Sequence, residues 1–374
     1  MLPKKEKQVV MTYKYKMYRS KSLRHLDRLI DYHCEVYNYC IALHRRYYKM
    51  YRKHLSANKL KVHLTKVRKR SDKEHWKELG SQSIQDVAER IERSYKAFFD
   101  AKKEHRGGRH SIPHFCKRKN YSSFTLKQAG YKFHDGNHIT ILGKDYKYVA
   151  HRPYEGTIKT VSIKRDNCGD FWLCIVCAKP ASIVIPRKGN AIGYDFGLKT
   201  FLTGSDGSRI ESPRFLEQNA TALRSAQRAL SRKRKGSANW RRAKMDVARK
   251  YQYVKDCRKD WFYKLAVDIA SQYSDVCIED LNIKAMQQLW GRKVSDYAFT
   301  EFVGILQYQL SKTGGQMHKV DRFFPSSKTC SHCGHVVKDL PLNVRHWECP
   351  SCHVMLDRDG NAATNILVEG MKSA

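Results

Sequence analysis

Three carboxylates lie within or next to apolar segments of the sequence, where a charged side chain is unexpected. Asp195 lies inside the apolar run 191–197, Glu279 closes the apolar run 275–279, and Asp359 comes just before an amphipathic stretch that begins at Ala362. A charge in a buried strand costs free energy unless it is paired or bound to a metal. A bound metal ion would supply that compensation at all three positions.

Each acid also has a simpler explanation. Asp195 could pair with Lys199, Glu279 could be an exposed strand end, and Asp359 with Gly360 could form a turn or a helix N-cap. Taken together, an acid on a first strand, one on a later strand and one at a final helix resemble the order of a ribonuclease-H-like nuclease. That resemblance implies two bound Mg²⁺ or Mn²⁺ ions and metal-dependent hydrolysis of a nucleic-acid backbone.

Four cysteines form a second candidate site close to Asp359. Cys330, Cys333, Cys349 and Cys352 have the spacing C-x2-C-x15-C-x2-C, and four thiolates in this pattern are typical of one structural zinc ion. The alternatives are four unrelated buried cysteines or two disulfides of a secreted protein, and the absence of a recognisable signal peptide argues against the second. The remaining cysteines, including the Cys174–Cys177 pair in an apolar run, are expected to be core residues of a reduced intracellular protein.

The charge indicates a long polyanionic partner. Lys and Arg number 72 against 36 Asp and Glu, which leaves +36 spread over the chain. Nucleic acid is the economical candidate. A basic membrane-surface protein is the rival, but no apolar run reaches the roughly 18 residues of a membrane span, and we expect no membrane attachment.

The elements that must position these residues fall into two halves. Alternation predicts a strand over 9–17, helical periodicity follows from Leu23 to Ile41 and from about Ser81 to Phe99, and short strand-like runs return after Pro113. This pattern suggests a small barrel with a helical module inserted after its first strand. Buried-type strands at 191–197 and 275–281, with long basic helices between them, begin the second half.

Four segments carry a specific resemblance. The stretches 192–199, 278–282, 320–330 and 357–363 look like the successive signatures of TnpB, the family of insertion-sequence-encoded nucleases related to type V CRISPR effectors. The resemblance implies an RNA-guided DNA endonuclease of the prokaryotic cytoplasm or nucleoid, with a guide RNA and a double-stranded DNA target that carries a short flanking motif. It places the catalytic, Mg²⁺-binding acids on Asp195, Glu279 and Asp359, with Asp357 ranked behind Asp359, and the zinc ligands on Cys330, Cys333, Cys349 and Cys352.

The resemblance also implies a multidomain α+β fold: an RNase H-like (RuvC) α/β nuclease domain with an inserted zinc ribbon, preceded by a wedge β-barrel with an inserted helical recognition domain. The expected domains are 1–20 (first barrel strand), 21–108 (helical recognition domain), 109–187 (remainder of the barrel), 188–325 (first part of the nuclease), 326–354 (zinc ribbon, binding target nucleic acid) and 355–374 (second part of the nuclease).

Two basic segments are candidates for nucleic-acid contact. Residues 41–70 hold eleven Lys and Arg and no acid, with tyrosines interleaved, and residues 224–259 hold fourteen against two acids. For any single residue here, a solvated helix face is the simpler interpretation. The candidates are Arg45, Arg46, Tyr51, Lys53, Arg232, Lys233, Arg234, Lys235, Arg241 and Arg242, with Gln82, Ser83 and Gln85 as candidate readers of base edges.

Three other functions remain open at this stage. The chain could be a miniature type V CRISPR effector, a guide-independent nuclease of the junction-resolving kind, or a non-catalytic zinc-ribbon regulator whose acids are structural. Whether one or two chains bind each RNA is also open.

Overall fold

The chain folds into two compact units, Met1–Ser182 and Ile183–Ala374. The computed structural model describes residues 8–104, 111–180, 189–197, 199–281, 291, 297–341 and 343–372. The predicted boundaries after residues 108 and 187 lie outside the described residues, and the domain limits stay predictions. None of the helices in the described ranges combines the length and the apolar content that crossing a bilayer takes.

The first unit contains two antiparallel sheets. Its strands are β1 (Gln8–Lys16), β2 (Ser123–Leu126), β3 (Tyr131–His134), β4 (His138–Ile141), β5 (Lys144–Lys147), β6 (Thr157–Arg165) and β7 (Phe171–Pro180). One sheet has the order β1-β7-β6-β2 and the other the order β3-β4-β5. β1 pairs with β7 along its whole length, from Gln8 opposite Pro180 to Lys16 opposite Trp172. The first strand therefore joins later strands, as the sequence predicts, while closure into a barrel stays a prediction.

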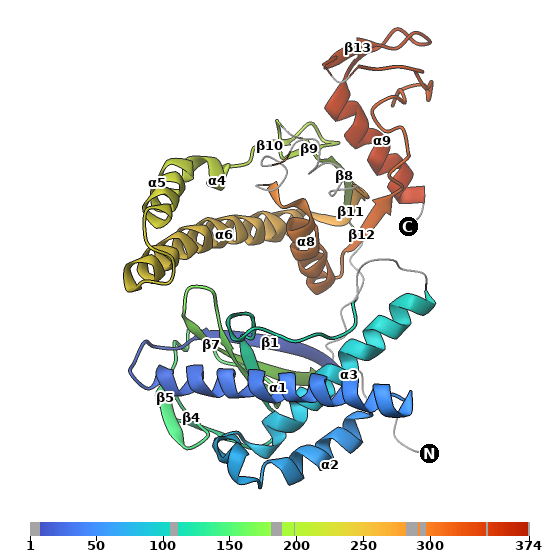
Figure 1. Ribbon diagram of the computed structural model, residues 1–374. Helices are drawn as coiled ribbons and strands as arrows, with labels where there is room; N and C mark the ends of the chain where they lie inside the picture. The colour runs from blue at the N-terminus through green and yellow to red at the C-terminus, as the bar shows by residue number, and fades with distance from the viewer. Residues whose placement is uncertain are drawn as a thin grey trace. The chain divides into compact units, whose positions relative to one another are not determined.

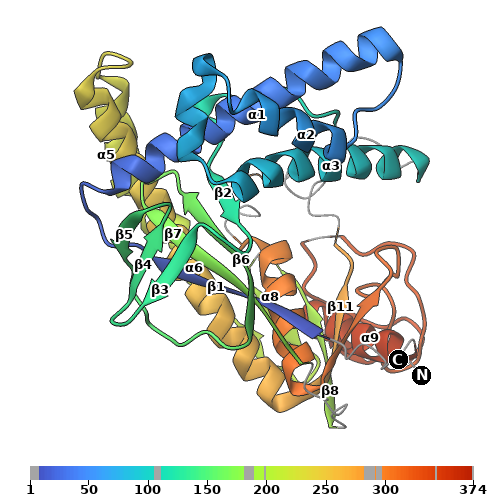
Figure 2. The ribbon, with the colours of Figure 1, turned by 90° about the horizontal axis from the view of Figure 1, so that it is seen from below.

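The helices of this unit lie between β1 and β2 in the chain. They are α1 (Leu23–Tyr51), α2 (Ala57–Val67), η1 (Ser71–Glu78), α3 (Ser81–Lys103) and the short η2 (Arg118–Asn120). α1 and α2 both pack along α3 (Figures 1 and 2). The apolar stripes predicted for α1 and α3 enter a single core with the strands, except at the end of α3, where Phe98 lies outside the core cluster and Phe99 is 46% exposed. The apolar stripe of α3 therefore extends beyond the part of the helix that the core covers.

The second unit is built on a mixed five-stranded sheet of order β10-β9-β8-β11-β12. Its elements are β8 (Asn190–Asp195), β9 (Leu202–Gly204), β10 (Arg209–Ile210), α4 (Phe215–Gln218), α5 (Ala220–Ser231), α6 (Ala238–Gln272), β11 (Tyr273–Glu279), α8 (Phe299–Thr313), β12 (Gln316–Val320), β13 (His346–Glu348), β14 (Met355–Asp357) and α9 (Arg358–Lys372). β11 runs parallel to both β8 and β12, so β8 and β11 end at the same edge of the sheet.

Helices cover both faces of this sheet. On one face α6 and α8 pack against alternate strand residues such as Val276 and Ile278, and on the other Ile366 of α9 meets Cys277 and Val320 (Figure 1). Because successive residues of a strand point to opposite faces, β11 contributes to both layers. This explains why Val276, Cys277 and Ile278 follow one another as apolar residues.

A small subdomain lies between β12 and α9 in the chain. It holds the two-stranded sheet of β13 and β14, and its own core is made by Cys330, Leu340, Trp347 and Cys349. A core this small needs a further constraint to be stable, and a bound metal ion is the usual one.

Candidate metal centres

The three candidate acids meet in one cavity of about 430 Å³. Asp195 is the last residue of β8, Glu279 is the last residue of β11, and Asp359 lies in the first turn of α9. Tyr194 and Ile278 are paired in the register of the two parallel strands, which brings the two strand ends together. The cavity is lined by Asp195, Glu279, Phe323, Phe324, Pro325, Ser326, Ser327, Lys328, Arg358, Asp359 and Ala362.

The electrostatics of this cavity favour a bound cation. Burial, together with the negative charges of Asp359 and Glu279, raises the pKa of the Asp195 carboxyl to about 7, against an opposing contribution from Arg358. Burial and the neighbouring Asp280 raise the pKa of Glu279 to about 7. Two carboxyls that hold their protons near neutral pH lack a compensating positive charge, and a divalent cation with a preference for oxygen ligands would provide it.

The simpler explanations of these acids do not fit the described residues. No ion pair joins Asp195 to Lys199 among them, and Glu279 is half-buried and lines the cavity. Asp357, not Asp359, provides the helix cap, since its Oδ1 accepts the backbone N–H of Asp359 at 3.2 Å. The Oδ2 of Asp357 accepts from Arg209 at 2.6 Å, so this acid is turned away from the cavity.

Close backbone packing sets the position of Asp359. Gly193 of β8 lies directly against α9: a Cβ at this position would be 2.2 Å from the carbonyl oxygen of Ala363 and 2.6 Å from the amide nitrogen of Leu367. Only a glycine allows helix and strand to approach this closely. The helix that carries Asp359 is thereby held against the strand that carries Asp195.

Two buried asparagines of α9 tie the helix to the loop before the first cysteine pair. The Nδ2 groups of Asn361 and Asn365 donate to the carbonyl of Thr329 at 2.8 and 2.6 Å, and the Oδ1 of Asn361 accepts from the backbone N–H of Ser331 at 2.8 Å. Sequence reasoning missed both residues. Two asparagines four residues apart in an apolar helix were the available signal, since buried amides need partners.

Two arginines connect the subdomain to the carboxylate cavity. Nη1 of Arg358, a largely buried side chain, donates to the carbonyl oxygen of Pro341 at 2.6 Å. Nη1 of Arg345 donates to both oxygens of Asp359, at 3.1 and 3.3 Å. Neither contact was predicted from the sequence, because each joins α9 to a residue 14 or 17 positions earlier in the chain, and only the folded structure brings Pro341 and Arg345 to this helix.

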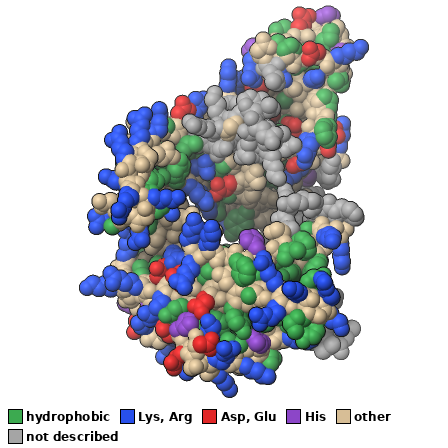
Figure 3. All heavy atoms as spheres, in the orientation of Figure 1, with side chains coloured by type: hydrophobic (Ala, Val, Ile, Leu, Met, Phe, Trp, Pro, Cys, Tyr) green, Lys and Arg blue, Asp and Glu red, His purple; other side chains and the backbone are tan. Residues whose placement is uncertain are grey.

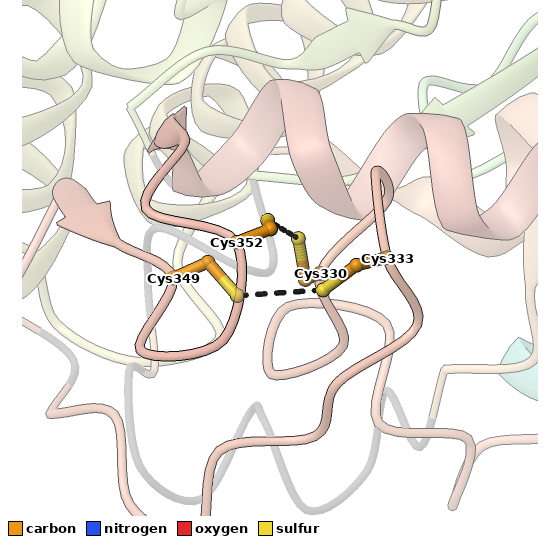
Figure 4. A group of neighbouring side chains, drawn as sticks. All are labelled: Cys330, Cys333, Cys349 and Cys352. Atoms are coloured by element: carbon orange, nitrogen blue, oxygen red, sulfur yellow. Dashed lines mark hydrogen bonds between the residues drawn. The ribbon is translucent and has the colours of Figure 1, made fainter.

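The four cysteines form a cluster whose geometry fits zinc. Their sulfurs lie within 4.8 Å of one another, with 3.6 Å between Cys330 and Cys352 and 3.6 Å between Cys333 and Cys349 (Figure 4). Four sulfurs at roughly 2.3 Å from one zinc ion would be about 3.8 Å apart, whereas a disulfide requires about 2.05 Å. The alternative of two disulfides therefore does not fit these distances, and the set of four thiols matches the structural zinc site that the sequence predicts.

Each cysteine pair lies on a tight turn that aims its sulfurs inward. The N–H of Gly334 donates to the carbonyl of Cys330 at 2.9 Å, and the N–H of His353 donates to the carbonyl of Cys349 at 2.9 Å. Both closing residues have left-handed backbones, with φ of 78° at Gly334 and 59° at His353. The second turn therefore places a histidine where a glycine would be less strained.

The predicted nucleic-acid residues are not all available at the surface. Arg45, Arg46, Tyr51 and Lys53, around the end of α1, are exposed. Ser83 is buried and donates to the carbonyl of Gly80 at 2.7 Å, so the prediction that it reads bases is not carried forward.

The two glutamines differ from each other. Oε1 of Gln82 accepts the backbone N–H groups of Gln128 and Ala129 at 2.7 and 3.0 Å, which commits that oxygen to holding a loop. Gln85 lines a groove of about 270 Å³ beside Lys61, Arg68 and Lys77. Of the three candidates at the start of α3, Gln85 is therefore the one best placed to meet a ligand.

The second basic segment forms an exposed surface. Arg232 to Lys235 connect α5 with α6, Arg241 and Arg242 lie in the first turns of α6, and Lys and Arg side chains gather over α5 (Figure 3). Sequence reasoning missed Arg224 and Arg228, which line a cavity of about 400 Å³ together with Arg232. Their spacing of four residues was the signal, because it places all three on one face of a helix.

Two family models match consecutive segments of the chain, the first of which begins in β7. Residues 175–289 match OrfB_IS605, described as "Probable transposase", and residues 299–366 match "Cas12f1-like, TNB domain", which includes the four cysteines and Asp359. Among solved structures, "Structure of the mini-RNA-guided endonuclease CRISPR-Cas_phi3" aligns with a TM-score of 0.50 at 10% identity, over 96% of this chain and 92% of that one. That likeness concerns the fold alone.

Relatives match over nearly the whole chain. A protein of Streptomyces pristinaespiralis named "Putative RNA-guided DNA endonuclease" is 29% identical over 98% of this chain and 91% of its own length. InsQ of Escherichia coli, with the same printed description, is 26% identical over 90% and 86%. "TnpB-like protein L79" of Acanthamoeba polyphaga mimivirus is 26% identical over 60% and 46%. The IS605-type model, the TNB domain and these relatives agree with one another, and the chain is similar to proteins of the TnpB family over nearly its whole length.

Proposed function

We propose that this protein is an RNA-guided DNA endonuclease that cuts double-stranded DNA at one metal-dependent RuvC site. The observation that carries the proposal is the meeting of Asp195, Glu279 and Asp359, from three separate elements, in one cavity. The printed names of the relatives from Streptomyces and Escherichia coli support the guided, DNA-directed form of this activity.

Asp195, Glu279 and Asp359 would hold Mg²⁺ or Mn²⁺. Their oxygens are the ligands such ions prefer, and the raised pKa values of Asp195 and Glu279 leave the cavity in need of positive charge. When bound, the ions supply an activated water and stabilise the leaving oxygen of the phosphodiester. The chain's own contribution is to hold three carboxylates on rigid elements, with α9 fixed by Gly193 and the two asparagines.

The four-cysteine subdomain would act as structural support for this site. A closed set of four thiolates leaves no open position for chemistry on a zinc ion. Through Asn361 and Arg358 the subdomain is bonded to the first turns of the helix that bears Asp359. A zinc ion would therefore shape the segment that delivers this acid.

The first unit would recognise the nucleic acids. We assign its sheets to a wedge barrel and α1–α3 to an inserted recognition domain, because β1 pairs with β7 while all three helices lie between β1 and β2 in the chain. The groove beside Gln85 combines cations with an amide and could meet the motif flanking the target.

The arginine face of α5 would bind the RNA or DNA backbone. Arg224, Arg228 and Arg232 recur every fourth residue, about 6 Å apart along the helix axis. No Asp or Glu occurs between residues 218 and 245, so no nearby carboxylate in the sequence neutralises them. Guanidinium groups presented in this way are suited to successive phosphates.

The test is guided cleavage by the purified protein. RNA that copurifies is sequenced, and a plasmid matching its variable end is compared with a plasmid carrying a scrambled match, in Mg²⁺ and in EDTA. We expect cutting of the matched plasmid alone, and only in Mg²⁺.

Two outcomes would overturn the proposal. Cutting that persists after RNase treatment would identify a guide-independent nuclease. The absence of both bound RNA and cutting would favour the non-catalytic regulator.

A further inference from the structure

Phe323 is the most exposed large hydrophobic side chain among the described residues. It is 86% exposed, and the next, Met355, is 64% exposed. Leaving a phenylalanine in water forgoes about 2 kcal/mol of burial free energy, and the described part of the chain offers its ring no aromatic or cationic partner. Among the described residues of the second unit, no packing contact accounts for an aromatic side chain at this position.

The loop that carries Phe323 is firmly built. The Oδ1 of Asp321 accepts the N–H of Phe323 at 2.8 Å, and the carbonyl of Asp321 accepts the N–H of Phe324 at 3.1 Å. Phe324 packs against the cluster of Cys277, Val320 and Ile366. Of two adjacent phenylalanines, one anchors the loop and the other is presented to solvent.

Phe323 lines the same cavity as the three acids. The lining also includes polar and basic residues, among them Ser326, Ser327 and Lys328. A cavity of about 430 Å³ has the size of a small-ligand site, roughly 300–1,000 Å³, and can take one nucleotide of a strand at a time. The chemistry of its lining suits a phosphate flanked by a base.

An aromatic ring in this place requires an unpaired base. In a duplex the faces of the bases are covered by their neighbours, whereas a separated strand exposes them for stacking on aromatic side chains. Stacking of this kind tolerates any sequence, because every base has a π face. That tolerance agrees with the proposed function, in which base pairing with a guide RNA recognises the target sequence.

We propose that Phe323 stacks on an unpaired base of the DNA strand beside the phosphate that enters the carboxylate cavity. The inference rests on the proposed function and deepens it: the cutting site accepts a separated strand, and Phe323 is a positioning residue that sets its register. Lys328, which lines the same cavity, provides positive charge for the strand's backbone.

The first test compares Phe323 variants in guided cleavage of a target with an unpaired bubble at the cut site. Base stacking is worth about 1–3 kcal/mol, so Phe323→Ala should lower kcat/KM by roughly 5- to 150-fold, mostly through KM. Phe323→Tyr should retain wild-type cutting, whereas Phe323→Leu, which keeps the apolar bulk, should behave like Phe323→Ala. Met355→Ala is the matched control, since it removes an exposed apolar side chain outside the cavity.

A second measurement reports stacking without cleavage. In an Asp195→Asn background, 2-aminopurine placed on either side of the cut phosphate should be quenched on binding, and Phe323→Ala should restore its fluorescence. Thermal unfolding of Phe323→Ala should match wild type, because the side chain is almost fully exposed in the folded protein.

The outcomes separate the two proposals. If the wild-type protein does not cut, the proposed function fails and takes this inference with it. If wild type cuts and Phe323→Ala cuts within twofold with unchanged 2-aminopurine fluorescence, the inference alone is overturned. Wild-type cutting by Phe323→Leu, together with a defective Phe323→Ala, would also overturn it, because apolar bulk and not stacking would then be sufficient.

Discussion

Replacing Gly193 with alanine tests whether close packing of α9 on β8 sets the geometry of the carboxylate cavity. The added methyl carbon would lie 2.2 Å from the carbonyl oxygen of Ala363, 2.6 Å from the amide nitrogen of Leu367 and 2.8 Å from its Cβ. Carbon atoms in proteins pack at about 3.5–4.0 Å, so the helix must move away by about 1 Å. All three atoms belong to the helix that carries Asp359, and two of them are backbone atoms that cannot rotate aside.

The expected consequences are a less stable unit and slower cutting. Overpacking of this kind costs about 1–3 kcal/mol, and a displacement of about 1 Å at a reacting centre can lower a rate by about 100-fold. Urea unfolding of the second unit measures the first effect, and single-turnover guided cleavage measures the second.

Gly304→Ala is the matched control. Gly304 lies within α8 of the same unit, and a Cβ added there would meet nothing within 4 Å. This change should be neutral or stabilising by up to about 1 kcal/mol, because alanine is the better helix former. If Gly193→Ala unfolds within 0.5 kcal/mol of wild type, on the order of the error of such measurements, and cuts within twofold, the packing argument is wrong.

Three further predictions follow from the charged and metal-binding groups. In EDTA the free energy of unfolding should fall as the pH rises from about 4 to about 7, because Asp195 and Glu279 with pKa values raised to about 7 keep protons in the folded state that the unfolded chain has released. Asp195→Asn should remove up to about 4 kcal/mol of this decrease in unfolding free energy, because the pKa of Asp195 is raised by about three units and each unit corresponds to 1.36 kcal/mol. Equal slopes of unfolding free energy against pH in wild type and variant would contradict this prediction. Cys349→Ser should lower the zinc content measured by elemental analysis and abolish guided cleavage. Cys257→Ser on α6 should change neither property. A fully active, zinc-free Cys349→Ser protein would show that the zinc assignment is wrong. Arg228→Ala should weaken RNA binding and reduce the slope of log K against log salt concentration by about one. The control is Lys264→Ala, which removes a cation that is paired with Asp260. An unchanged slope for Arg228→Ala would refute the proposal that α5 binds the nucleic-acid backbone.

The acids and cysteines could be found from the sequence because each departs from the residue pattern expected of an ordinary strand, helix or core. Asp195 places a charge in an apolar strand, and the cysteine spacing has few explanations other than a metal. The insertion of helices after β1 was also predictable, since a strand that precedes a helical module needs later strands as partners. Such signals depend on residue type, spacing and order along the chain, and they can be recognised without tertiary information.

The residues that hold the site together could not be found in the same way. Asn361 and Arg358 act through partners that lie far from them in the chain, and their roles appear only when the loops around the cysteines return to α9. Ser83 failed as a candidate because packing against the start of α3 buries it. Gly193 carried a usable signal, since a glycine inside a strand often marks a close backbone approach.

The central claim is that the three carboxylates of one cavity form the cutting site. Guided cleavage of a matched plasmid in Mg²⁺ should be measured for Asp195→Asn, Glu279→Gln and Asp359→Asn, each beside Asp357→Asn, whose carboxylate pairs with Arg209 outside the cavity. The account predicts that each of the first three abolishes cutting while RNA binding is retained, and that Asp357→Asn keeps most of the activity. Efficient cutting by any of the first three variants, or a loss at Asp357 equal to theirs, would contradict it.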